Sequence, residues 1–324
     1  MIIKKREKPI QMIKLEALDG RLSTDHEKKF MVRQHLSNRQ AGYKGEQSLD
    51  YYLYFLPESK YHIFHGLRLF DGTHYFQIDT LLLSENFLLI LEIKRMAGIL
   101  KFEPQFNQFM RITEENVTEV FPDPIVQVKR QKFQLNRWLE YHNLSINLPL
   151  ETLVISTSTK AILQTSLGDK TVQEKVVHKE SLPFKINKLE SNYSKARINQ
   201  LDLQNLSQLL LKSHSPFNPD ILNTYEITQS DILTGVHCPK CKHIPMIRQR
   251  GSWVCQACRL LSRIAHEKAL TDYSLLINNK ITNHQAREFL HIQSDSVTKR
   301  ILNTACSGFH GERKSRIYTL DNHP

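Results

Sequence analysis

Three charged residues lie close together in one of the most apolar parts of the sequence: Asp79, Glu92 and Lys94. The segments 77–84 and 87–94 are rich in Leu and Ile and flank a polar turn, which predicts a hairpin of strands covered on both faces. An ionised carboxylate in such a place costs several kcal/mol unless it is paired or binds a metal. Side chains alternate across a strand, so Glu92 and Lys94 share one face, which Asp79 can reach from the neighbouring strand.

These groups indicate a particular chemistry. Two carboxylates at one position can hold a hard divalent cation through oxygen ligands, and a lysine beside them can orient or activate a water molecule for attack on phosphorus. The alternative is a salt-bridged Glu-Lys pair on a half-exposed edge strand, since Glu-x-Lys alone is common. The upstream acid and the apolar strands on both sides favour the metal site.

The elements that must position these groups follow from hydrophobic periodicity. A helix beginning at Ala41 and ending before Pro57 has an apolar face that would bring Glu46 towards the sheet. A proline-rich turn at 121–125 opens a second helix, which runs to Tyr141 and carries Gln127 in its first turn. The expected strands are residues 61–69, 75–83, 87–94, 98–102 and 150–156, and residues 1–40 are expected to form a helical N-terminal extension with a turn at 19–20.

Four cysteines near the C-terminal third form two Cys-x-x-Cys pairs: Cys238, Cys241, Cys255 and Cys258. Each pair places two thiolates on one side of a backbone turn, and two such turns complete a tetrahedron around zinc. Because all four positions are thiolates and none is open to water, we expect a structural Zn²⁺ site. His237 and His243 are alternative ligands or exposed neighbours. The basic residues around the pairs contact phosphates or form a solvated face.

The C-terminal segment has the pattern of a winged helix-turn-helix. Helices are predicted from Thr282 or Asn283 to Leu290 and from residue 294 to about 304, and the tail at 308–320 is typical of a wing. The residues expected to face nucleic acid are Thr298, Lys299 and Asn303 on the second helix and Arg313, Lys314 and Arg316 on the wing. Winged-helix domains also bind proteins, which is the alternative for this segment.

The overall charge is strongly basic. The chain of 324 residues has 44 Lys and Arg against 33 Asp and Glu, a formal net charge of +11. Such an excess indicates a polyanionic partner or an anionic membrane face, and we expect nucleic acid, most of all DNA, and no small-molecule substrate. The N-terminal residues lack the apolar core of a signal peptide and no apolar run is long enough to span a bilayer, so we expect a cytoplasmic protein without a membrane partner.

Taken together, four segments resemble the nuclease-related domain (NERD) family of the PD-(D/E)XK restriction-endonuclease-like superfamily. They are Gly42-Tyr-Lys-Gly-Glu46-Gln, Gln77-Ile-Asp79, Leu91-Glu92-Ile-Lys94 and Phe121-Pro-Asp-Pro-Ile-Val-Gln127, and the resemblance covers about residues 30–160. It implies a four-stranded mixed core sheet flanked by helices, with Asp79 and Glu92 as ligands of Mg²⁺ or Mn²⁺ and Lys94 positioning the attacking water. It also implies that Glu46 assists and that Gln127 contacts the substrate backbone or the active-site network. The chain departs from the family in having Phe-Pro-Asp-Pro where an Asn-Pro pair is usual.

The predicted fold class is α/β: a restriction-endonuclease-like mixed sheet flanked by helices, with a small zinc ribbon and a C-terminal winged helix-turn-helix. The expected domains are an extension at 1–40, a nuclease-like domain at 41–225, the ribbon at 232–262 and the winged helix at 263–324. The predicted function is metal-dependent hydrolysis of DNA phosphodiester bonds. Two alternatives remain: a non-catalytic, regulatory DNA-binding protein that retains the nuclease-like scaffold, and an RNA-directed nuclease.

Overall fold

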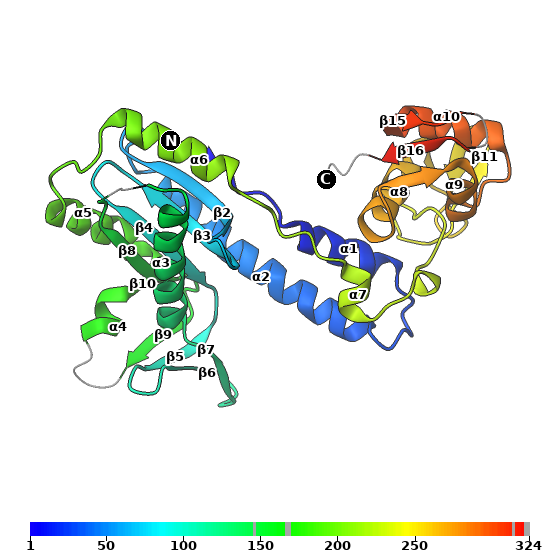
Figure 1. Ribbon diagram of the computed structural model, residues 1–324. Coiled ribbons are helices and arrows are strands. Elements are labelled where there is room, and N and C mark those ends of the chain that lie inside the picture. The colour runs from blue at the N-terminus through cyan, green and yellow to red at the C-terminus, as the bar shows by residue number, and fades with distance from the viewer. Residues whose placement is uncertain (145–146, 166–169, 313–314, 321–324) are drawn as a thin grey trace. The chain divides into compact units, whose positions relative to one another are not determined.

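The computed structural model describes residues 1–144, 147–165, 170–312 and 315–320 (Figure 1). The chain separates into two compact units: residues 1–8 with 39–217, and residues 9–38 with 218–324. The expected extension at 1–40 therefore divides between the units. The chain passes from one unit to the other after Lys8, after Asn38 and after Phe217.

A mixed six-stranded sheet forms the centre of the first unit. Its strands are β1 (Ile2–Lys4), β2 (His62–Phe70), β3 (Tyr75–Leu83), β4 (Leu88–Lys94), β8 (Leu150–Ser156) and β10 (Val176–His178), in the order β1-β2-β3-β4-β8-β10. β3 is antiparallel to β2 and β4, whereas β1, β8 and β10 each run parallel to their neighbours. The sheet thus has two strands more than the family resemblance implied, and these are the short edge strands β1 and β10.

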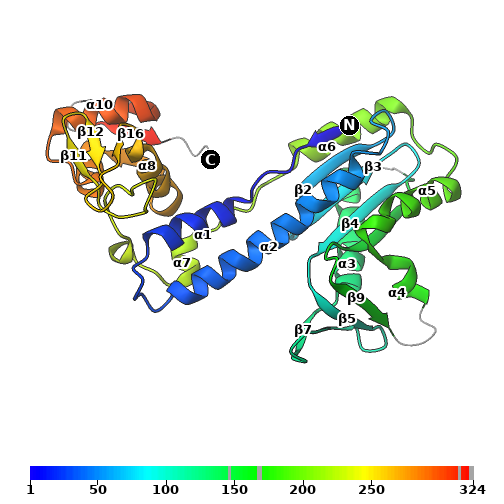
Figure 2. The same ribbon diagram turned by 180° about the vertical axis from the view of Figure 1, so that it is seen from behind.

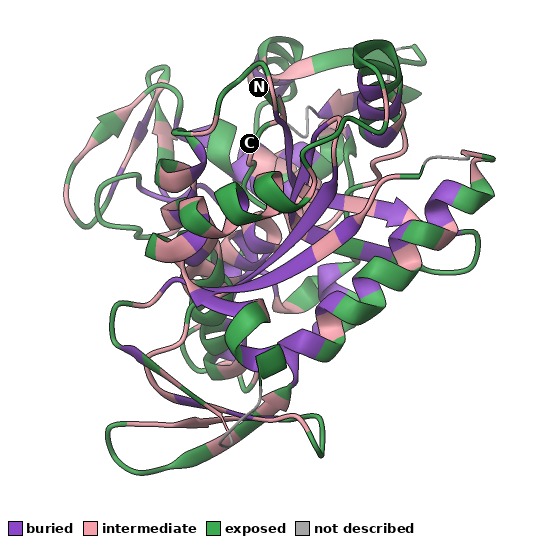
Figure 3. Ribbon diagram, turned by 90° about the vertical axis from the view of Figure 1, so that its left-hand side faces the viewer, coloured by how far each residue is buried: buried purple, intermediate pink, exposed green. Residues whose placement is uncertain are grey.

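Helices cover both faces of this sheet, as the apolar strand sequences predicted. One face packs against α3 (Pro124–Tyr141) and α6 (Gln200–Lys212), and the other against α2 (Lys29–Leu53) and α5 (Leu182–Asn192). Figure 3 shows the central strands almost entirely in the colour of buried residues. Leu91 and Ile93 belong to the α2 and α5 side, which leaves Glu92 and Lys94 on the α3 side.

A second sheet and short helices complete the first unit. The sheet has the order β7-β6-β5-β9, formed by β5 (Gly98–Glu103), β6 (Gln108–Ile112), β7 (Thr118–Pro122) and β9 (Ala161–Thr165). α4 (Lys170–Lys175) and the 3₁₀ turn η1 (Lys179–Ser181) connect to β10 and α5. β6 and β7 were not predicted, because their charged and polar residues hide the alternation that marks a strand.

α2 is one continuous helix, although the sequence predicted a break near Ala41. Gly42 and Gly45 each disfavour a helix by about 1 kcal/mol relative to alanine. Gly45 packs so closely on the sheet that a Cβ at this position would lie 2.6 Å from the Cβ of Arg95. The glycine is therefore needed for the close approach of the helix that carries Glu46.

The second unit contains helices and two small antiparallel sheets. Its helices are α1 (Ile10–Arg21), the first part of α2, α7 (Ile221–Tyr225), η2 (Gln229–Asp231), α8 (Ala265–Leu276), α9 (Asn283–Leu290) and α10 (Asp295–Ala305). Its sheets are β11 (Ile247–Gln249), β12 (Ser252–Val254) and β13 (Leu261–Ser262), and β14 (Lys280–Thr282), β16 (Ile317–Leu320) and β15 (Cys306–His310) in that spatial order. Thr282 caps α9 in a capping box and Ser294 caps α10, as predicted. The expected turn at 19–20 is absent, because both residues lie within α1.

A buried ion pair explains why residues 9–38 group with the C-terminal part of the chain. The Arg21 side chain of α1 is fully buried, and its Nε donates to Asp272 Oδ2 on α8 at 2.9 Å. Its Nη1 donates to Leu233 O at 2.7 Å, and the guanidinium lies 4.6 Å from the ring centroid of Phe289.

None of the helices in the described part of the chain is both long and apolar enough to cross a bilayer.

Candidate active site and candidate zinc site

Glu92 is held in a fixed orientation on the α3 side of the sheet. Its side chain is only 3% exposed, and Oε1 accepts a hydrogen bond from Lys94 Nζ at 2.8 Å. Oε2 accepts from Gln131 Nε2 on α3 at 2.9 Å. Lys94 Nζ also donates to Gln127 Oε1 at 3.1 Å, so the glutamine in the first turn of α3 contacts the catalytic candidate predicted on β4.

Asp79 lies where the pairing of β2 and β3 is interrupted. The register runs from His65↔Thr80 to Leu67↔Ile78 without a Gly66↔Asp79 pair, and Gly66 has the left-handed φ of 59°. On the other side of β3, beyond the last β3–β4 pair Thr80↔Leu91, Asp79 Oδ2 accepts a hydrogen bond from the backbone N–H of Ile93 at 2.9 Å. This bond fixes Asp79 Oδ2 next to the backbone N–H of Ile93, the residue between Glu92 and Lys94.

Glu46 approaches from α2 and is bound by a residue that the sequence did not single out. Arg6, whose side chain is 6% exposed, donates from Nη1 to Glu46 Oε2 at 2.7 Å and from Nη2 to Asp50 Oδ1 at 2.9 Å. Its Nη2 also lies 2.8 Å from Nδ1 of His65, which therefore acts as an acceptor. Burial, followed by the charge of Arg6, lowers the pKa of His65 to about 4, so this ring is neutral at physiological pH.

Two of these carboxyl groups have pKa values above their usual range. Burial, followed by the charges of Glu92 and Glu46, raises the pKa of Asp79 well above its usual value. Burial also raises the pKa of Glu46, and Arg6 opposes this rise. A divalent cation would relieve this repulsion, and Mg²⁺ commonly uses one or two protein carboxylates together with water. The residues therefore fit a magnesium site formed by Asp79 and Glu92.

The raised pKa of Asp79 leads to a prediction about stability. Because the pKa of Asp79 is higher in the folded state, its protonated form contributes fully to the free energy of unfolding below the unfolded-state pKa of about 3.9. This contribution is lost as the pH rises through the folded-state pKa. We expect Asp79→Asn, which avoids this loss, to raise the melting temperature by a few degrees at pH 7.5 without divalent metal. Calorimetric melting of the variant and of Asp202→Asn, an exposed control, measures the effect. A melting temperature below that of the wild type would contradict it.

Arg6 should act on the site through Glu46. Replacing it by glutamine removes the guanidinium that orients Glu46 and forms its only ion pair among the described residues, so we expect metal binding weaker by about 10–100-fold. Lys5→Gln, with the same charge change at an exposed neighbour, is the matched control. Metal affinity from calorimetry tests the expectation. Equal behaviour of the two variants would remove Arg6 from the site.

The four cysteines form a cluster with the geometry of a zinc site. Their sulfur atoms all lie within 4.8 Å of one another, with Cys238 Sγ 3.6 Å from Cys258 Sγ and Cys241 Sγ 3.5 Å from Cys255 Sγ. A tetrahedron with Zn–S bonds of about 2.3 Å has sulfur–sulfur distances of roughly 3.8 Å. Among the described residues, these four cysteines are the group of three or more His, Cys, Asp or Glu side chains whose ligand atoms lie this close to one another. The cluster is therefore consistent with structural zinc.

The backbone repeats the same turn at both Cys-x-x-Cys pairs. Lys242 and Arg259, each directly after the second cysteine, have left-handed φ values of 61° and 59°, and their N–H groups donate to the carbonyls of Cys238 and Cys255. His237 is buried and lies 2.9 Å from Gly20 O, so it is neither a ligand nor an exposed neighbour, whereas His243 is exposed.

The residues predicted to face nucleic acid differ in position. Lys299 and Asn303 are exposed on α10. Thr298 is fully buried and its hydroxyl donates to Ser294 O at 3.1 Å, so the prediction that it faces a groove is wrong. Arg316 is half-buried, with its guanidinium 4.0 Å from the centroid of Phe309. The predicted contacts Arg313 and Lys314 lie outside the described residues.

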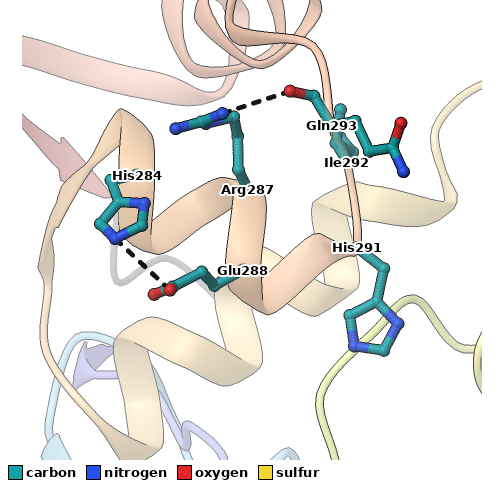
Figure 4. A pocket seen from close by; sticks show the side chains of 6 residues that line it. All are labelled: His284, Arg287, Glu288, His291, Ile292 and Gln293. Atoms are coloured by element: carbon teal, nitrogen blue, oxygen red, sulfur yellow. Dashed lines mark hydrogen bonds and ion pairs between the residues drawn. The ribbon is translucent and has the colours of Figure 1, made fainter.

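A shallow pocket follows the C-terminal end of α9. It is lined by His284, Arg287, Glu288, His291, Ile292 and Gln293 (Figure 4). Arg287 Nη1 donates to Gln293 O at 3.2 Å, and His284 Nε2 lies 3.4 Å from Glu288 Oε1. The first contact joins α9 to the turn that follows it, the second lies within α9, and together they form no set of groups arranged for catalysis.

Comparison with known proteins identifies part of the chain. Residues 41–157 match the family model described as nuclease-related domain (NERD), a range that contains Glu46, Asp79, Glu92, Lys94 and Gln127. No curated protein and no solved structure matches the chain.

Proposed function

Because residues 41–157 are a nuclease-related domain, we propose that the protein is a metal-dependent nuclease that hydrolyses DNA phosphodiester bonds. The observation that carries the proposal is the joining of Glu92, Lys94 and Gln127 by hydrogen bonds within this domain. Lys94 is half-buried, with 26% of its side chain exposed.

Each residue has a separate role in this proposal. Asp79 and Glu92 would hold Mg²⁺ or Mn²⁺, which would supply stabilisation of negative charge on the phosphate. Lys94, oriented by Glu92 and Gln127, aligns the attacking water by donating a hydrogen bond to it. Glu46 adds negative charge next to the ligands, and Arg6 fixes its orientation.

The second unit supplies the proposed substrate-binding modules. The four cysteines would bind a structural zinc ion in a zinc ribbon with the sheet β11-β12-β13. Helices α9 and α10 and the sheet β14-β16-β15 would form a winged helix-turn-helix. Exposed Lys299 and Asn303 would then face the nucleic acid. The net charge of +11 supports a polyanionic substrate.

A cleavage assay over several substrates tests the function. Duplex DNA, single-stranded DNA and single-stranded RNA are incubated with the full-length protein, with Mg²⁺, with Mn²⁺ or without added divalent metal. We expect metal-dependent cutting of DNA. Cutting of RNA alone would replace DNA by RNA as the substrate.

Calorimetric titration separates the nuclease from a non-catalytic DNA-binding scaffold. We expect Mg²⁺ binding that Asp79→Ala abolishes. DNA binding without any Asp79-dependent metal binding would favour the scaffold.

A further inference from the structure

One side of α3 leads away from the candidate active site along the outside of the first unit. The helix begins at that site, because Gln127 in its first turn contacts Lys94. α3 packs on the face of the sheet opposite α2 and α5, so it lies in front of the strands in Figure 1 and behind them in Figure 2. Its outward residues recur three or four positions apart, as expected for one side of a helix. We call this set the α3 face: Val126, Arg130, Phe133, Arg137 and Tyr141.

Three members of the α3 face are apolar or aromatic and exposed. Phe133 has 60% of its surface exposed, and Val126 and Tyr141 are exposed as well. Single exposed apolar residues are ordinary on a protein surface. A row of them on one side of a helix leaves apolar area that a partner would remove from water.

Positive charge lies beside these residues. Arg130 and the neighbouring Lys129 are exposed, and among the residues that the structure describes neither forms an ion pair with a carboxylate. Arg137 adds a third cation, whereas Glu140 is the only acidic residue of α3. The exposed side of this helix therefore attracts a polyanion.

Arg137 is held beside the ring of Phe133. Its Nη2 donates to Thr73 Oγ1, in the turn between β2 and β3, at 2.7 Å, and its guanidinium lies 6.0 Å from the ring centroid of Phe133. This hydrogen bond uses one of the five N–H groups of the half-buried side chain, so others are left for a phosphate oxygen. A side chain held in this way loses less conformational freedom when it binds a ligand than a mobile one.

We propose that the α3 face binds a single strand of nucleic acid that extends from the candidate active site. An unpaired base stacks on Phe133, and Arg130 and Arg137 bind phosphates on either side of it. A ring between two cations complements a polymer in which bases and phosphates alternate. The bases of a duplex are stacked on one another, so their faces are not available to Phe133.

The position of the α3 face makes it continuous with the proposed cleavage site. At a rise of 1.5 Å per residue, Arg137 lies about 15 Å along the helix axis from Gln127, which corresponds to several nucleotides. The inference rests on the proposed function for the chemistry of the ligand. It narrows the substrate to nucleic acid that has unpaired nucleotides next to the bond that is cut.

The base contact is tested by binding, separately from cleavage. Fluorescence anisotropy with a short labelled single-stranded DNA, and with a duplex of equal length, is recorded in the Lys94→Arg background without added Mg²⁺. We expect Phe133→Ala to weaken binding of the single strand roughly tenfold and to leave duplex binding nearly unchanged. Phe133→Trp keeps a stacking surface and should bind like the parent, whereas Phe133→Leu keeps only apolar area and should not. Equal losses for both DNAs, or full binding by Phe133→Leu, would overturn the base contact.

The phosphate contacts are tested by the salt dependence of single-strand binding. Arg130→Gln and Arg137→Gln should each reduce the slope of log K against log [KCl] by about 0.7. The double variant should lose about 1.4, because the two arginines bind different phosphates. Phe133→Ala should leave the slope unchanged. Slopes that stay at the parent value in both arginine variants would rule out these contacts.

Helix α5 supplies a matched control on the other side of the sheet. Phe184 is 75% exposed, and Lys188 is exposed four residues later, the same spacing as Phe133 and Arg137. Phe184→Ala and Lys188→Gln should leave affinity and salt slope unchanged. Losses equal to those of the α3 variants would mean that any exposed ring or cation has this effect, and the α3 face would lose its assignment.

Light scattering tests the other occupant, a second copy of the chain. We expect the molar mass of the protein to be the same with Phe133 and with alanine at this position. Self-association that Phe133→Ala abolishes would assign the α3 face to contact between copies and would contradict the proposal.

The two proposals fail independently. Protein that shows this binding pattern but cuts no nucleic acid would end the nuclease proposal and leave the α3 face as a strand-binding surface. Metal-dependent cutting, together with binding that is insensitive to Arg130, Phe133 and Arg137, would have the opposite meaning.

Discussion

Replacing Lys94 by methionine is expected to slow DNA cleavage by about 10²–10⁴-fold, because the variant loses the group proposed to position the attacking water. The ammonium lies 2.8 Å from Glu92 Oε1 and 3.1 Å from Gln127 Oε1, and both bonds orient it. Initial rates with saturating Mg²⁺ measure the effect. Lys101→Met on β5, which removes a half-buried lysine that is likewise paired with a glutamate, Glu103, should cut at the wild-type rate.

A second variant separates catalysis from charge. Lys94→Arg keeps a cation beside buried Glu92, so the fold should be retained, but the planar guanidinium cannot occupy the position of a compact ammonium. We expect cleavage to fall nearly as far as in Lys94→Met while the melting temperature stays close to that of the wild type. Wild-type cleavage by the arginine variant would mean that Lys94 supplies only positive charge.

Removal of zinc is expected to unfold the ribbon. Structural zinc contributes about 10–16 kcal/mol in small zinc domains, which matches or exceeds the whole stability of a typical domain. Cys238 and Cys255 are fully buried, as is Trp253 on β12, whose Nε1 donates to His266 Nδ1. Cys255→Ser, or prolonged treatment with a strong zinc chelator, should therefore expose Trp253.

Tryptophan emission reports this unfolding with a suitable background. The chain has two tryptophans, and Trp138→Phe leaves Trp253 as the only one. Loss of zinc should shift its emission to longer wavelength, with about one zinc released per chain in a colorimetric assay. Cys306→Ser lies outside the four-cysteine cluster and should retain the metal. Release of zinc with unchanged emission would show that the ribbon folds without it.

Much of the first unit was predictable because its strands carry strong local signals. β3 and β8 have the predicted bounds, since continuous apolar runs end at polar turns. The same runs identified Glu92 and Lys94, because charged residues within them are conspicuous. The contact of Gln127 with Lys94 fits the family resemblance, which expected this residue to touch the substrate backbone or the active-site network.

Other residues near the site have no such signal. Gln131 contacts Glu92 and lies one helical turn after Gln127, so the i, i+4 spacing on α3 was the available indication. Arg6 is one of several cations in a charged N-terminal segment, and only the pairing of β1 with β2 brings it to Glu46. Thr298 was misplaced because an isolated helix pattern does not show which polar residue bonds back to its own backbone.

The division of the chain has a consequence for its synthesis. Residues 9–38 leave the ribosome first among the parts of the second unit, but Asp272, the partner of Arg21, is translated only after the whole first unit. The second unit is thus a discontinuous domain with a nuclease-like domain inserted into it, and it must fold late through contacts distant in sequence. A fragment limited to residues 41–157 would lack β1 and Arg6, and a chain truncated before Asp272 would leave Arg21 without its anion, so deletion experiments should keep both ends of the chain.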